Sequence, residues 1–143
     1  MGNRASWGTR KFYSEQVAWA LAQIDRFYNG SSISVDAYLQ MCHELGQDPD
    51  PDEMPPEIGD FPLEIQEAFV THAMLPDRWD GASGSYMGKD WSPLKDLLDI
   101  NGVEDHKTVC FFLKHIESCS TININAELKR KQDADRRRSK AKK

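Results

Sequence analysis

Apolar side chains recur at spacings of three and four along most of the chain, the pattern of helices that bury one face. The first such run begins at a capping residue, Ser14, and stops at Gly30. The second begins after a cap at Ser34 and stops at Gly46. The pattern therefore predicts two helices joined by Gly-Ser-Ser, a helical hairpin that occupies residues 1–46.

Three further helical runs follow, and we expect them to build a core over residues 61–128. They begin at Pro62, at Ser92-Pro93 and at Glu104-Asp105. Their apolar positions are Leu63, Ile65, Ala68, Phe69, Leu94, Leu97, Leu98, Val109, Phe112, Leu113 and Ile116. Residues 120–125 leave two readings open, because the last helix either breaks there and restarts at Ala126 or runs straight through. The predicted fold is mainly α, a small helical domain of about five helices.

The segment from Leu75 to Trp91 lacks helical periodicity but carries three glycines and three large aromatic rings. A solvated linker would not normally hold two tryptophans, because each ring gains most when it leaves water. We therefore predict a long ordered Gly/aromatic loop. One reading makes it a docking surface for another protein, and the other makes Trp79 and Trp91 plugs in the core. The predicted protein-interaction residues are Arg78, Trp79, Asp80, Tyr86, Lys89 and Trp91.

The net charge of −5 is divided unevenly along the chain. Residues 1–128 hold 9 basic and 21 acidic side chains, a net charge of −12. Within them, residues 47–60 have six carboxylates, four prolines and no basic residue, which predicts an extended, solvated acidic linker. Residues 129–143 hold 9 basic and 2 acidic side chains, a net charge of +7. We call this segment the basic tail.

The basic tail has no apolar side chain larger than alanine, so it cannot join the core. Such a segment either stays solvated or contacts a polyanion such as nucleic acid. No aromatic residue lies between its charges, so base stacking is not available. The predicted polyanion contacts are Lys129, Arg130, Lys131, Arg136, Arg137, Arg138, Lys140, Lys142 and Lys143.

The motifs for catalysis, metals and nucleotides do not fit, so we predict no catalytic residue, no metal and no cofactor. Gly88-Lys89 precedes a helix, but Ser83 and Asp90 stand where a phosphate-binding loop needs glycine and Ser or Thr. The pairs His106–Cys110 and His115–Cys119 fall on opposite sides of a helix, so they do not converge on one zinc ion. A small enzyme of unknown reaction stays open as an alternative.

No apolar run approaches the roughly 18–20 residues that cross a bilayer, so we expect no integral membrane segment. The start of the chain lacks a hydrophobic signal core. Three cysteines cannot all pair within the chain, which favours reduced thiols inside a cell.

Four segments resemble small accessory proteins encoded by large tailed bacteriophages. They are Phe61-Pro62-Leu63-Glu64-Ile65, Leu75-Pro76-Asp77-Arg78-Trp79-Asp80-Gly81, Gly88-Lys89-Asp90-Trp91 and Phe111-Phe112-Leu113-Lys114. The resemblance implies a virion component or an assembly factor such as a tail-assembly chaperone, located in the host cytoplasm or in the virion. The main expectation is a non-enzymatic interaction or assembly factor with a protein partner. The alternative is a nucleic-acid-binding accessory protein that acts through the basic tail.

Overall fold

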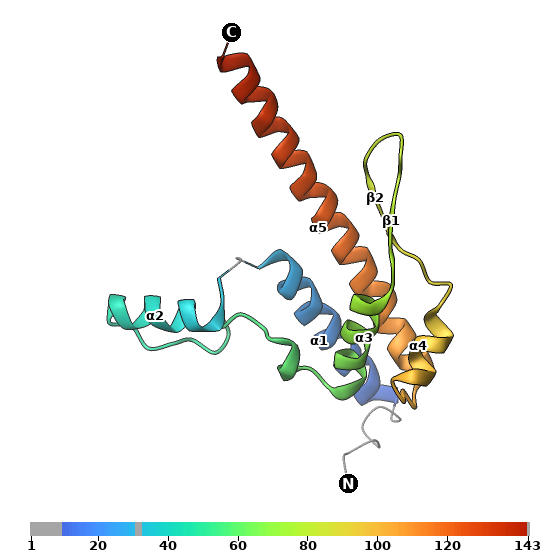
Figure 1. The fold of residues 1–143 in the computed structure, drawn as a ribbon. Helices are drawn as coiled ribbons and strands as arrows, with labels where there is room; N and C mark the ends of the chain where they lie inside the picture. Colours follow the sequence, from blue (N-terminus) through green and yellow to red (C-terminus); the bar gives the residue numbers. More distant parts are fainter. Residues whose placement is uncertain (1–9, 31–32, 143) are drawn as a thin grey trace. The chain divides into compact units, whose positions relative to one another are not determined.

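The computed structural model describes residues 10–30 and 33–142, and they are mostly helical, as the apolar spacing predicts. The elements in chain order are α1 (Arg10–Asn29), α2 (Val35–Leu45), the short 3-10 helix η2 (Ile58–Asp60), α3 (Leu63–Met74), β1 (Asp77–Trp79), β2 (Tyr86–Lys89), α4 (Leu94–Ile100) and α5 (His106–Ala141) (Figure 1). The chain divides into two compact units, residues 1–66 and 67–143, with the boundary inside α3.

The first unit contains both predicted N-terminal helices. Helix α1 already starts at Arg10, so Ser14 lies inside the helix and the predicted cap there is wrong. Helix α2 begins and ends as predicted, because the Ser34 hydroxyl oxygen accepts a 3.2 Å hydrogen bond from the Ala37 N–H. Gly46 closes the helix with φ of +66°, a conformation that glycine adopts at little cost. The packing of α1 and α2 as a hairpin stays a prediction.

The acidic segment 47–60 is more structured than the extended spacer expected from its prolines and charges. The guanidinium of Arg26 donates hydrogen bonds to the backbone carbonyls of Asp52 (2.8 Å) and Met54 (3.1 Å), which fixes this segment on α1. A turn and the helix η2 follow within it. The sequence analysis missed this structure because the arginine that organises it lies about 26 residues earlier in the chain.

Helix α5 carries the core of the second unit. Asp105 caps its start by accepting a 3.1 Å hydrogen bond from the Thr108 N–H. The predicted apolar face is confirmed, since Val109, Phe112, Leu113 and Ile116 are fully buried. Phe111 is 48% exposed, so it does not widen that face. The helix continues through residues 120–125 without a break, which decides between the two readings of this segment.

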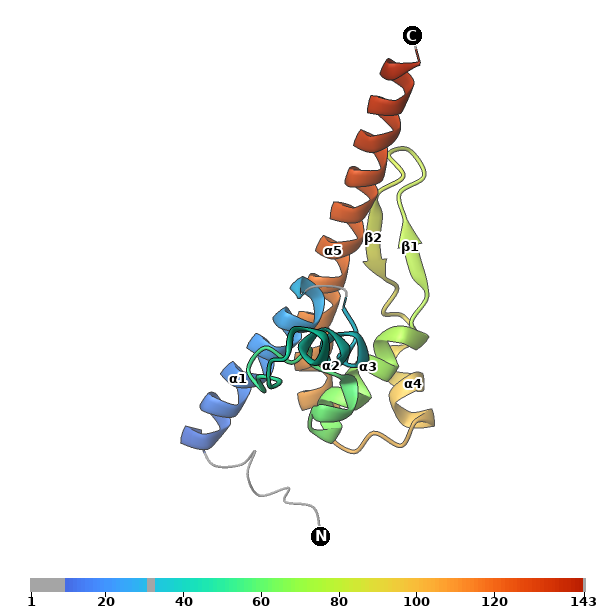
Figure 2. The same cartoon turned by 90° about the vertical axis from the view of Figure 1, so that its left-hand side faces the viewer.

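The Gly/aromatic segment contains a β-hairpin, which the sequence analysis missed. Strands β1 and β2 pair antiparallel, with Asp77 opposite Lys89 and Trp79 opposite Tyr86. The register is irregular between these pairs, because β2 holds one residue more than β1 over the same stretch. Both views show the hairpin beside α5 (Figures 1 and 2).

Candidate functional site

The candidate site is the β1–β2 hairpin together with the part of α5 that it contacts. The base of the hairpin is closed by the carboxylate of Asp77. Its Oδ1 accepts a 2.7 Å hydrogen bond from the Tyr86 hydroxyl and lies 2.8 Å from the Lys89 ammonium. The hydrogen bond from Lys89, followed by that from Tyr86, lowers the pKa of Asp77 below its ordinary value. The three side chains tie the two strands together where the hairpin begins.

Glu117 of α5 holds the second strand and the residues after it. Its Oε1 accepts a 2.8 Å hydrogen bond from the Lys89 backbone N–H, and its Oε2 accepts one from the indole N–H of Trp91. Gly88 lies directly against this carboxylate, with φ of +87°. A Cβ at Gly88 would come within 2.8 Å of Glu117 Oε1, so the close approach requires glycine.

Asn125, two helical turns after Glu117, makes a second attachment. Its Oδ1 accepts a hydrogen bond from the Tyr86 backbone N–H, and its Nδ2–H donates one to the Tyr86 carbonyl, each 2.9 Å long. One side-chain amide thus satisfies both backbone groups of Tyr86, as a neighbouring strand would. Residues eight apart differ by about 80° around a helix, so Glu117 and Asn125 lie on one broad side of α5 and both reach β2.

The predicted interaction residues divide into two groups in the structure. Arg78 and Trp79 lie on the surface, where the indole of Trp79 is 54% exposed and its edge packs on the Tyr86 ring at a centroid distance of 4.9 Å. Tyr86 is 2% exposed, and Lys89 and Trp91 are partly buried. Trp79 is therefore not a core plug, and Trp91 is bound to α5.

Asp80, the sixth predicted residue, organises the tip of the hairpin. Its carboxylate accepts hydrogen bonds from the backbone N–H and the hydroxyl of Ser83, which lower the pKa of the carboxyl. Asp90 accepts in the same way from Ser92. Asp77, Asp80 and Asp90 each serve a separate set of partners.

His72 of α3 belongs to this site and was missed by the sequence analysis. It is 8% exposed, and its Nε2 lies 3.7 Å from Glu117 Oε1, too far for a hydrogen bond. Burial lowers the pKa of His72, while the nearby Glu117 carboxylate acts in the opposite direction. Only the three-dimensional approach of α3 to α5 could have revealed the pair, because 45 positions separate them in the chain.

The basic tail is helical up to Ala141, and its described basic side chains are exposed. Lys143 lies outside the described residues. Lys131 makes a 3.3 Å ion pair with Glu127, one turn earlier on the same helix. Figure 2 shows the last turns of α5 extending past the tip of the hairpin.

The two predicted histidine–cysteine pairs have different surroundings. His115 Nε2 lies 3.7 Å from Cys119 Sγ on one face of α5. His106 Nε2 lies 3.6 Å from an Asp99 carboxylate oxygen instead of joining Cys110. Burial raises the pKa of the Cys110 thiol, which lowers its reactivity.

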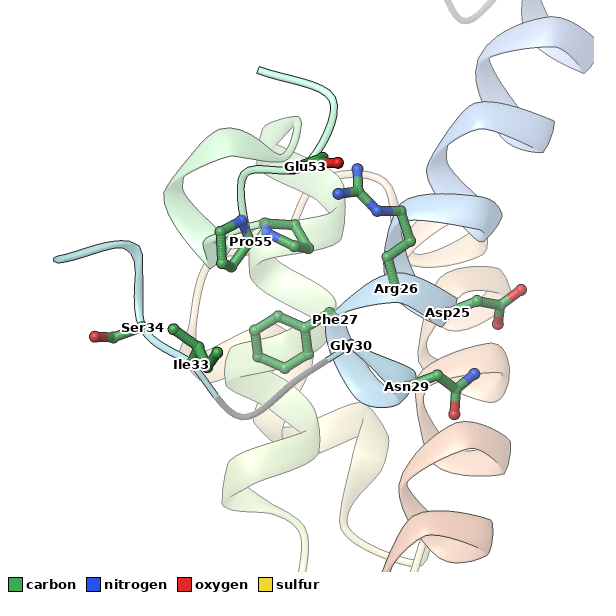
Figure 3. Close-up of a pocket in the computed structure, with 10 residues that line it drawn as sticks. Asp25, Arg26, Phe27, Asn29, Gly30, Ile33, Ser34, Glu53 and Pro55 are labelled. Carbon is green, nitrogen blue, oxygen red and sulfur yellow. The ribbon is translucent and has the colours of Figure 1, made fainter. Parts of the chain in front are cut away.

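The first unit has an open hollow of about 620 Å³ next to Arg26 (Figure 3). Phe27, Ile33 and Pro55 give it apolar walls, and Asp25 and Glu53 add carboxylates. The Arg26 guanidinium is already committed to the backbone of the acidic segment. No described interaction indicates what this hollow would bind.

Comparison with protein-family models, with curated proteins and with solved structures finds no match to this chain. None of the described helices has an apolar stretch long enough for crossing a bilayer.

Proposed function

We propose that the protein is a non-enzymatic interaction or assembly factor that binds a protein partner through the outer surface of its β1–β2 hairpin. The observation that carries the proposal is the exposure of Trp79 beside Arg78 on a hairpin fastened to α5. Trp and Arg dominate the binding energy of many protein interfaces. Because the hairpin is fastened to α5, its exposed indole loses little conformational entropy when it binds a partner protein.

Three contacts provide that support. Glu117 and Asn125 bind the backbone of β2, and the Asp77–Lys89 pair closes the hairpin base. A partner would therefore meet a surface that is already ordered, instead of a loop that must fold first. The resemblance to accessory proteins of tailed bacteriophages makes a virion or tail-assembly protein the partner that we propose.

The test is affinity purification of the full-length protein from its native source, followed by mass spectrometry. The variants are Trp79→Ala and the matched control Trp19→Ala, which removes a similarly exposed indole (49%) from α1. We expect a partner that is retained by the wild-type protein and by Trp19→Ala but lost from Trp79→Ala. Retention of the same proteins by both variants would contradict the proposal.

A second candidate function is binding of a polyanion by the basic tail. The observation that favours it is the exposure of the tail's basic side chains on a helix that carries them away from the buried part of α5. Removal of residues 129–143 should abolish retention on immobilised heparin, and retention by the full chain should weaken steeply with salt. Unchanged retention after the deletion would exclude this function.

A further inference from the structure

The basic tail has a definite arrangement because it is part of one continuous helix. At about 100° per residue, three rows of side chains run along it. The central row consists of Arg130, Ala134, Arg137 and Ala141, at spacings of four, three and four. The flanking rows lie about 100° to either side and consist of Lys129, Arg136 and Lys140 on one side and Lys131, Arg138 and Lys142 on the other.

The remaining side of the helix is different in character. Leu128, Gln132, Asp135 and Ser139 lie there, opposite the central row. The positive charge thus covers a broad arc of the helix, and the remaining side carries Asp135 and no basic side chain. Small alanine side chains alternate with arginine in the middle of that arc, where they allow a close approach to another surface.

We propose that the basic tail binds duplex DNA, with the helix lying in the major groove and the central row facing the base edges. This inference deepens the second candidate function and rests on it. A helix about 10–12 Å across fits a groove about 12 Å wide. In that position the two flanking rows face the phosphates of the two strands, and Arg130 and Arg137 reach the acceptors on the groove floor.

The arrangement favours duplex DNA over an acidic protein surface. A flat acidic surface would engage one face of the helix, whereas the tail carries cations on two flanks and between them. The 13 helical residues from 129 to 141 extend α5 by roughly 20 Å, more than twice the Debye length of about 8 Å at physiological salt, so the acidic side chains of α5 that precede the tail are largely screened at its C-terminal end. Asp133, close to one flanking row, is the acidic side chain that opposes this binding.

The first test compares two duplexes of the same sequence, one of DNA and one of RNA, by fluorescence anisotropy with the full-length protein. The major groove of an RNA duplex is too deep and narrow for a helix to enter. We expect the DNA duplex to bind at least about tenfold more tightly than the RNA duplex. Equal affinities would overturn the groove assignment, because a merely cationic tail responds to phosphates of either kind.

The second test changes the helix without changing its charge. Ala134→Pro breaks the helix in the middle of the basic tail, and Ala134→Ser is the matched control that keeps it. We expect Ala134→Pro to weaken DNA-duplex binding by about tenfold or more and Ala134→Ser to leave it within about twofold. Equal binding by both variants would contradict the proposal, and neither variant touches the core.

The third test uses two variants with the same change in charge. Asp133→Asn removes a carboxylate near the DNA-facing arc, and Asp135→Asn removes one from the opposite side. We expect Asp133→Asn to tighten binding severalfold more than Asp135→Asn. An equal gain would indicate contact without a preferred face.

The results separate the inference from the function on which it rests. If deletion of residues 129–143 leaves heparin and DNA binding unchanged, the second candidate function fails and the inference fails with it. If the deletion abolishes heparin binding but the full-length protein binds DNA, RNA and polyglutamate alike, polyanion binding stands and the groove assignment is overturned.

Discussion

Substitution of Asn125 by alanine should release the hairpin from α5. The Asn125 amide pairs with both the N–H and the carbonyl of Tyr86 at 2.9 Å, and Tyr86 is 2% exposed. Leaving a buried backbone group unpaired costs about 1–3 kcal/mol, and two groups are affected here. Partial entry of water reduces the sum, and the better helix propensity of alanine returns about 0.6 kcal/mol. We expect a loss of roughly 2–3 kcal/mol in the free energy of unfolding.

Two measurements check this expectation. Urea unfolding gives the change in stability, and amide hydrogen exchange shows where protection is lost. Exchange should accelerate in Tyr86–Lys89 while the amides of the buried turns of α5 stay protected. Gln132→Ala is the control, because it replaces an exposed side-chain amide on the same helix and should be neutral or slightly stabilising. A loss below about 0.5 kcal/mol with unchanged exchange would refute the role given to Asn125.

Three further predictions concern the same unit. Gly88→Ala should destabilise the protein by about 2–3 kcal/mol in urea unfolding, because φ at this position is +87° and the new Cβ would lie 2.8 Å from Glu117 Oε1. The Glu117 carboxylate cannot move aside easily, since the Lys89 and Trp91 N–H groups hold it. A neutral effect of Gly88→Ala would contradict the close approach. Burial lowers the pKa of His72, so below about pH 6.5 the unfolded chain takes up a proton more readily than the folded protein, and the free energy of unfolding falls as the pH drops. His72→Gln should flatten this part of the curve of stability against pH. An unchanged curve would show that another group causes the pH dependence. Phe112→Ala should cost about 3–5 kcal/mol and its neighbour Phe111→Ala less than about 1 kcal/mol, because the first ring is fully buried and the second is 48% exposed; equal losses in calorimetry would contradict the assigned face of α5.

Local rules of sequence were enough to place the ends of α2 and the buried face of α5. Ser34 and Gly46 bound α2 because a hydroxyl cap and a left-handed glycine act within a few residues of the helix end. The face of Val109, Phe112, Leu113 and Ile116 follows from spacing alone. Helix caps and apolar spacing depend only on residues close together in the chain, so they can be predicted from the sequence.

The hairpin and its attachment depend on residues far apart in the sequence, which is why they were not predicted. Burial alternates along β2 in the structure, where Tyr86 and Gly88 are buried and Met87 is exposed, but the sequence Tyr-Met-Gly-Lys shows no alternation of apolar and polar residues. Asn125 and Glu117, which hold the backbone of this strand, come much later in the chain. Gly88 is an informative case. In the sequence, Gly88 belongs to an incomplete phosphate-binding motif. In the structure, the absence of a side chain at Gly88 lets the Glu117 carboxylate lie close to the backbone of β2.

Residue type alone also did not show which of the candidate interaction residues are exposed and which contact α5. Trp79 and Trp91 have the same chemistry, yet one indole is half exposed while the other donates to Glu117. The difference arises because Trp91 lies within reach of the Glu117 carboxylate on α5, whereas Trp79 packs on the Tyr86 ring. Aromatic content alone therefore did not predict which ring faces outward.

Site-specific photo-cross-linking in the native source tests the central claim most directly. A photoreactive residue replaces Met87, which is 53% exposed on the hairpin, and in a parallel variant it replaces Ile122, which is 67% exposed on α5. We predict one discrete protein adduct from position 87 that disappears when Trp79→Ala is added, and no such adduct from position 122. The absence of an adduct at position 87, or the same adduct from both positions, would contradict a docking surface on the hairpin.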